Sequence, residues 1–99
     1  MEKEKLYTYA WQKFGAVSQC VVTMEECAEL TKELSKAIRG EANGLKIAEE
    51  VADVEIMLEQ VKQNFAIQTL VTGFKRDKIK RLEKRLINSR KQVQNDNNN

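Results

Sequence analysis

Two acidic motifs hold the residues of this 99-residue chain that are best suited to chemistry. Residues 25–29 read Glu-Glu-Cys-Ala-Glu, and residues 49–53 read Glu-Glu-Val-Ala-Asp. Residues three apart in a helix are surface neighbours, so each motif places a pair of carboxylates on one face. Two such pairs on facing helices would form a pocket of anionic oxygens, which a hard divalent cation prefers.

Solvent-exposed helix faces can carry the same residues, because glutamate is a strong helix former. Like charges three or four residues apart repel each other by roughly 0.2–0.5 kcal/mol per pair. Near the first motif, Lys32 and Lys36 are the compensating charges. A bound cation would remove the remaining repulsion, but the repulsion alone does not decide between a metal pocket and a solvated face.

Helices must position these motifs. The chain has no proline, four glycines and 32% charged residues, a composition that favours long helices over a sheet. Its length fits one small domain, so we predict an all-α fold. Apolar residues recur with the helical period in four stretches, and the predicted helices cover residues 3–14, 18–39, 45–64 and 75–91.

The segments outside these helices have distinct compositions. Gly15 is the expected stop of the first helix, and the Ser18 hydroxyl is a candidate N-cap for the second. Residues 65–74 are apolar and fit a buried connection, a short helix or an interface segment. Residues 92–99 are polar and rich in asparagine, which predicts a disordered tail after a helical domain over residues 1–91.

Helical geometry also predicts which side chains form the core. The expected inward residues are Leu6, Tyr9, Ala10 and Phe14, then Cys27, Leu30, Leu34 and Ile38, then Ile47, Val51, Val54, Leu58 and Val61. At about 100° per residue, Glu26, Glu29 and Glu33 share a stripe beside this core. Glu50 borders the core on the third helix with Asp53 farther out, while Glu55 and Glu59 fall on the expected solvent side.

Composition excludes several classes of protein. Cys20 and Cys27 are seven residues apart and the chain has no histidine, so a zinc site is not expected and both thiols are predicted to be reduced. No apolar run approaches the ~20 residues of a membrane span, and the N-terminus does not read as a signal peptide. We therefore predict a cytoplasmic protein without a membrane partner.

The order of the motifs resembles the MazG-like all-α nucleoside triphosphate pyrophosphohydrolases. In that family an EExxE motif precedes an ExxD motif, and a basic helix follows. Here these motifs lie at residues 25–29 and 50–53, and the basic stretch reads Lys78-x-x-Arg81-Leu82-x-x-Arg85. Phe14-Gly15 and Gln19 also match. The resemblance spans about residues 10–87 and is nearest in size to the single-domain phage and stand-alone bacterial members.

The resemblance implies a bundle of four to five helices that is completed by oligomerisation, as a homodimer or homotetramer. The implied reaction cleaves a (d)NTP to a (d)NMP and pyrophosphate by attack of water on the α-phosphorus. Four residues would hold Mg²⁺, or alternatively Mn²⁺: Glu26, Glu29, Glu50 and Asp53. Glu25 and Glu49 are both candidates for the base that accepts the proton of the water.

The basic helix and Gln19 would contact the substrate. Lys78, Arg81 and Arg85 follow an i, i+3, i+7 spacing on one face, and the resemblance implies that they neutralise the phosphate chain. A solvated basic face or a weak nucleic-acid contact is the alternative, although a nucleic-acid partner is not expected. Gln19 either faces the nucleotide or serves packing. The competing function is a non-catalytic helical interaction or nucleotide-binding protein that uses the basic fourth helix.

Overall fold

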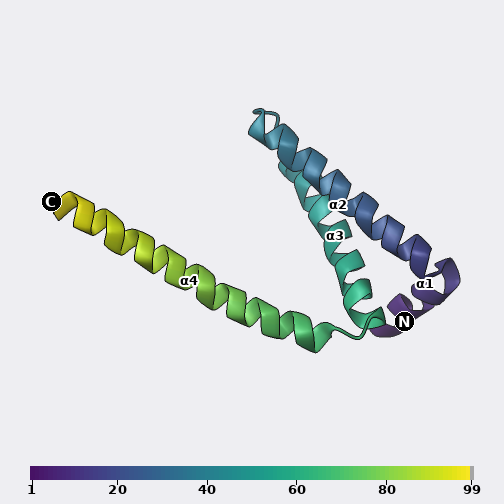
Figure 1. The fold of residues 1–99 in the computed structure, drawn as a ribbon. Coiled ribbons are helices and arrows are strands. Elements are labelled where there is room, and N and C mark those ends of the chain that lie inside the picture. The colour runs from purple at the N-terminus through teal and green to yellow at the C-terminus, as the bar shows by residue number, and fades with distance from the viewer. Residues whose placement is uncertain (99) are drawn as a thin grey trace. The chain divides into compact units, whose positions relative to one another are not determined.

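The chain is built from helices. The computed structural model describes residues 1–98, and in this range the helices are α1 (Lys3–Phe14), α2 (Ala16–Ile38), α3 (Gly44–Asn64) and α4 (Gln68–Asn98) (Figure 1). No strand occurs among the described residues. The predicted all-α class is therefore confirmed, and each predicted helix has a counterpart.

The helix ends differ from the prediction at two places. Gly15, with a φ of 92°, ends α1 and is followed directly by α2, so Ser18 lies inside α2 and the predicted Ser18 cap is wrong. Helix α4 begins at Gln68 rather than near Lys75 and includes the apolar stretch that was ambiguous in sequence. It continues to Asn98 through residues expected to form a disordered tail, and residue 99 lies outside the described range.

Helix α3 has a side-chain cap at its N-terminus. The Asn43 Oδ1 atom accepts a hydrogen bond of 3.1 Å from the backbone N–H of Lys46. This bond satisfies one of the first-turn amides that have no partner inside the helix. The Asn43 cap thereby fixes where α3 begins, and with it the position of the second acidic motif.

The chain divides into two compact units, Met1–Ile67 and α4 from Gln68. Within the first unit α2 and α3 lie side by side, and α1 packs against both (Figure 1). The two acidic motifs face each other in this α2–α3 pair. No helix within residues 1–98 is long and apolar enough to cross a bilayer.

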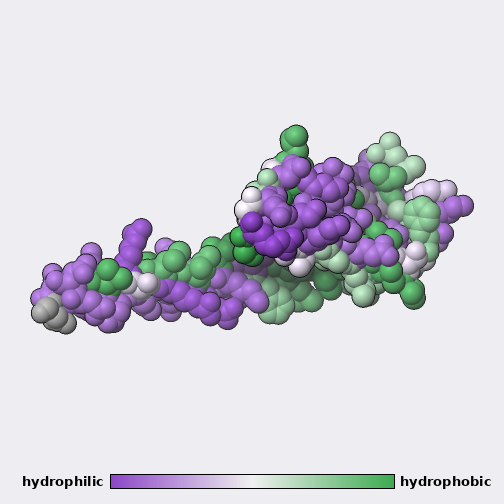
Figure 2. Space-filling model, turned by 90° about the horizontal axis from the view of Figure 1, so that it is seen from above, coloured by the Kyte–Doolittle hydropathy of each residue, from purple (hydrophilic) through white to green (hydrophobic). Residues whose placement is uncertain are grey.

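The side chains buried in the first unit are mostly polar, which corrects the predicted apolar core. The buried residues are Tyr7, Gln19, Glu33, Glu50, Met57 and Gln60. Of the expected core residues, Phe14 is 62% exposed, Leu34 is 47% exposed and Ile38 is 89% exposed. Helices α2 and α3 therefore meet along the polar stripes that flank their apolar stripes. The apolar side chains that remain exposed (green in Figure 2) interrupt the hydrophilic surface.

Hydrogen bonds and ion pairs make this polar interior possible. Every buried side-chain nitrogen and oxygen among residues 1–98 has a hydrogen-bond partner. A buried polar group without a partner would cost roughly 1–3 kcal/mol, so complete pairing removes the main penalty of such a core. The apolar stripes gain little from this arrangement, because they keep much of their contact with water.

A polar cluster joins α1 to α3. The Tyr7 hydroxyl donates a hydrogen bond of 2.5 Å to Glu59, and Lys3 lies 3.5 Å from the same carboxylate. The hydrogen bond from Tyr7 lowers the pKa of Glu59, and this bond together with burial raises the pKa of Tyr7 to about 12. Glu59 was expected on the solvent side, so its half-buried position is a correction, whereas Glu55 is exposed as predicted.

Replacing Tyr7 with phenylalanine should lower the free energy of unfolding by about 1 kcal/mol near neutral pH, because solvent screens the half-exposed Glu59. The lowered pKa of Glu59 gives stability that is present above its ordinary pKa and is lost as the pH falls through the folded value. The raised pKa of Tyr7 gives stability that is present below about pH 10 and lost toward about pH 12.

The difference in the free energy of unfolding between Tyr7→Phe and the wild-type protein should therefore shrink in acid, as Glu59 is protonated, and in alkali, as Tyr7 is deprotonated. Urea unfolding at neutral and at acid pH measures it, with Tyr9→Phe as the matched control, since Tyr9 is 57% exposed. An equal loss of stability at both pH values would show that packing rather than the Tyr7–Glu59 bond is responsible.

Candidate metal centre

Three carboxylates converge where α2 faces α3. Glu26 comes from α2, and Glu50 and Asp53 come from α3. One oxygen from each lies within 4.8 Å of the others. The i, i+3 spacing places Glu50 and Asp53 on one side of α3, and the packing of α2 on that side brings Glu26 to them.

The cluster is partly withdrawn from water, which makes its negative charge costly. Glu50 is 4% exposed, while Glu26 and Asp53 are half-buried. Burial raises the pKa of Glu26, and repulsion from Asp53 and Glu50 raises it further. Glu26 therefore gives up its proton less readily than an isolated glutamate, unless a positive charge enters the cluster.

The donor atoms fit a hard divalent cation. All three are carboxylate oxygens, the ligand type that Mg²⁺ and Mn²⁺ prefer over thiolate or imidazole. Oxygens bound to one Mg²⁺ at about 2.1 Å lie no more than about 4.2 Å apart. The spread of 4.8 Å is close to this limit, so small side-chain rotations would bring the three oxygens to one ion.

Two lysines form ion pairs with acidic residues of α2 and α3, and one of these residues, Glu50, belongs to the cluster. Lys46 Nζ lies 3.1 Å from Glu50 Oε1 and 3.9 Å from Glu49 Oε1. Lys36 Nζ lies 3.5 Å from Glu33, whose side chain is 5% exposed. The hydrogen bond with Glu50 raises the pKa of Lys46. Sequence reasoning missed Lys46 as a site residue, although its i, i+4 spacing to Glu50 was a readable signal.

A buried amide pair lies in the same interface. The Gln19 Nε2 atom donates a hydrogen bond of 2.9 Å to Gln60 Oε1, and Gln60 Nε2 lies 3.5 Å from the Met57 sulfur. Gln19 is 6% exposed, so it contributes to packing between α2 and α3. A role of Gln19 toward a nucleotide stays a prediction.

The other predicted site residues lie outside the three-carboxylate group. Glu29, Glu25 and Glu49 are exposed. Repulsion from Glu29 makes a small contribution to the raised pKa of Glu26, so Glu29 is near the cluster without joining it. The basic residues of α4 are exposed and belong to the second compact unit: Lys78, Arg81 and Arg85.

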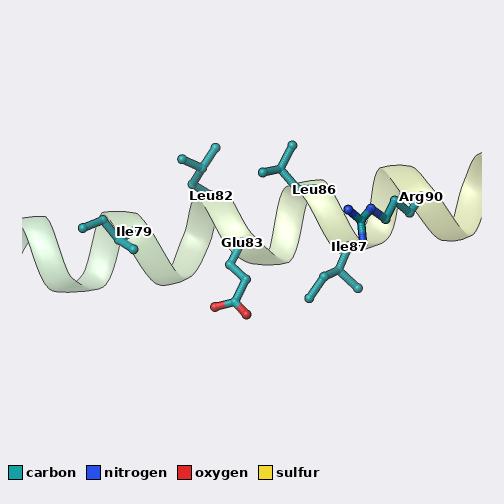
Figure 3. Close-up of a pocket in the computed structure, with 6 residues that line it drawn as sticks. All are labelled: Ile79, Leu82, Glu83, Leu86, Ile87 and Arg90. Carbon is teal, nitrogen blue, oxygen red and sulfur yellow. The ribbon is translucent and has the colours of Figure 1, made fainter.

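Helix α4 carries a surface groove of its own. In Figure 3 Leu82 and Leu86 project to one side of the helix, and Glu83 and Ile87 project to the other. The residues that line the groove are Ile79, Leu82, Glu83, Leu86, Ile87 and Arg90. All six come from one helix, so the groove is the surface of an amphipathic helix and does not enclose a small molecule.

The fold and the site define an all-helical chain with a carboxylate cluster between two helices. Comparison with protein-family models, with curated proteins and with solved structures finds no match. The resemblance to the MazG-like pyrophosphohydrolases therefore depends on the order and spacing of the motifs, and on the chemistry of the site.

Proposed function

We propose that this chain is an Mg²⁺-dependent nucleoside triphosphate pyrophosphohydrolase that cleaves a (d)NTP to a (d)NMP and pyrophosphate. The observation that carries the proposal is the convergence of Glu26, Glu50 and Asp53 within 4.8 Å. These residues belong to the two motifs whose order resembles the MazG-like family, and they come from two helices, Glu26 from α2 and both Glu50 and Asp53 from α3. Glu50 is buried and the other two are half-buried, so the group differs from a fully solvated helix face.

The proposed site assigns a task to each acidic residue. Glu26, Glu50 and Asp53 would hold the metal, and the resemblance adds Glu29 as a fourth ligand. Mg²⁺ when bound orients phosphate oxygens and lowers the pKa of the attacking water. The water oxygen forms a bond to the α-phosphorus as the bond to the β-bridging oxygen breaks, and pyrophosphate leaves. The exposed carboxylate of Glu25 or Glu49 takes the proton of the water.

The charge of α4 supports a role toward phosphate. Residues 68–98 contain nine lysines and arginines against three acidic residues, whereas residues 1–67 contain eight against twelve. Lys78, Arg81 and Arg85 would attract the triphosphate and stabilise the leaving pyrophosphate. A non-catalytic helical interaction through this basic helix is the second candidate function, and the exposed apolar side chains between Ile79 and Arg90 are the feature that favours it.

A panel of nucleoside and deoxynucleoside triphosphates tests the proposal. We expect pyrophosphate to be released from at least one of them when Mg²⁺ or Mn²⁺ is present, and none to be released with EDTA. Folding is checked by circular dichroism in both conditions. A folded protein that releases no pyrophosphate from any member of the panel would refute the enzyme and leave the binding protein as the better account.

The exposed apolar side chains support self-association as part of the proposal. Leu34 and Leu58 are 47% and 43% exposed although each lies in an apolar stripe, and a second copy of the chain would cover such stripes. Leu34→Lys should therefore shift the protein from a dimer or tetramer toward the monomer in sedimentation velocity. Ser18→Lys is the control, because Ser18 lies on α2 about 160° away around the helix. If the wild-type protein is a monomer at high concentration, the expected self-association is contradicted.

A further inference from the structure

Lys46 occupies a position at the edge of the carboxylate cluster that local helix energetics do not favour. It lies in the first turn of α3, where the positive end of the helix dipole disfavours a cation. Its pairing with Glu50 places lysine before glutamate at i, i+4, which is the weaker of the two orientations. Asn43 already caps the helix through the backbone of Lys46, so the side chain is free for another role.

The geometry ties this side chain to a proposed metal ligand. The Lys46 ammonium lies 3.1 Å from the carboxylate of Glu50, which is 5% exposed, while the Lys46 side chain is 42% exposed. A divalent cation held by Glu26, Glu50 and Asp53 would compete with the ammonium for the charge of Glu50. The flexible four-carbon stem of lysine lets the ammonium move away while it stays beside the site.

We propose that Lys46 is an exchangeable counter-ion, which neutralises Glu50 until a divalent cation takes its place and then binds the phosphate anion that the cation carries. The inference rests on the proposed function and adds a positioning residue for the pyrophosphate end of the substrate. The ammonium reaches such an anion because it already lies within hydrogen-bond distance of a ligating carboxylate. Lys46 therefore opposes the bare cation and favours the cation with its phosphate.

This dual role predicts that removing the Lys46 charge strengthens the binding of the metal and weakens the binding of pyrophosphate. A purely structural lysine would not produce this pair of opposite effects. In Lys46→Met the binding of Mn²⁺ alone should become roughly three- to tenfold tighter, because a positive charge is removed from the neighbourhood of the ion. The binding of pyrophosphate to the Mn²⁺-saturated protein should become roughly tenfold weaker, because a charge-assisted hydrogen bond is lost. Lys46→Arg should keep both affinities near those of the unchanged protein.

Isothermal titration calorimetry measures both steps, first with Mn²⁺ and then with pyrophosphate at saturating Mn²⁺. Lys62→Met is the matched control, since Lys62 is a half-buried lysine near the other end of α3. Lys46→Gln repeats the test if Lys46→Met does not fold by circular dichroism. Unchanged or weaker Mn²⁺ binding in the folded variant, or unchanged pyrophosphate binding, would overturn the role of Lys46. An unchanged protein that binds neither Mn²⁺ nor pyrophosphate would overturn the proposed function as well.

Discussion

Replacing Glu50 with glutamine is expected to lower the release of pyrophosphate from the substrate by roughly 10²–10³-fold, the size of effect seen when one electrostatic contact to a transition state is lost. Glu50 is the most buried of the three converging carboxylates, so water cannot readily substitute for it. The amide keeps the shape of the side chain but removes its negative charge. It would also place N–H groups next to Glu26 and Asp53, where a metal requires only acceptors.

The loss should come from the metal step rather than from unfolding. Initial rates measured over a range of Mn²⁺ concentrations separate the two, because a weakened metal site recovers part of its activity at high metal. Glu55→Gln is the control, since this substitution makes the same chemical change at an exposed position of the same helix. Full activity of folded Glu50→Gln would show that the cluster is not the catalytic centre.

The sequence was sufficient to predict helices close to α1, α2 and α3 and the pairing of Glu50 with Asp53 on one face of α3. The 3.6-residue period and the scarcity of helix breakers are local properties, so the positions of α1, α2 and α3 follow from residues near them. The i, i+3 spacing is also local, and it fixed Glu50 and Asp53 on one face before any packing was known. The convergence then required only that α2 lie against that face.

The choice of that face could not be predicted in the same way. Helix periodicity orders the residues around each helix, but Leu34 and Glu33 are neighbours on α2 and either could face α3. In the structure Glu33 is buried and Leu34 is 47% exposed, and an ion pair with Lys36 compensates part of the buried charge. Which face of α2 packs against α3 depends on contacts between residues far apart in sequence, as does the pairing of Tyr7 with Glu59.

The same dependence applies to the other predicted site residues. Glu29 was assigned from its place in the motif, yet it is exposed beside the cluster. Lys78, Arg81 and Arg85 were assigned from the order of the motifs, and they lie in a separate compact unit. Contacts between residues of different units are not encoded by spacing along the chain.

Replacing Glu26 with glutamine should stabilise the protein without metal by about 0.5–1 kcal/mol at neutral pH, as the like charges of Asp53 and Glu50 then lose a repelling neighbour. The sign follows from the raised pKa of Glu26. A glutamate with a raised pKa in the folded state favours folding when protonated, below its unfolded pKa, and loses that contribution as the pH rises through the folded value. The gain from Glu26→Gln should therefore vanish in acid, where Glu26 is itself neutral.

With metal the order should reverse, and this is the larger effect. A ligand at about 100 times its Kd stabilises a folded protein by about 2.7 kcal/mol, and this stabilisation requires the site. Mn²⁺ should therefore raise the melting temperature of the unchanged protein above that of Glu26→Gln, although the variant melts at the higher temperature in EDTA. Thermal unfolding at neutral and acid pH, with Glu55→Gln as control, measures both parts. If Glu26→Gln is less stable than the wild-type protein in EDTA, Glu26 stabilises the fold. If Mn²⁺ stabilises Glu26→Gln as strongly as the wild-type protein, the cation binds elsewhere. A crossing of the two stabilities would identify Glu26 as a residue kept for its metal at a cost to the fold.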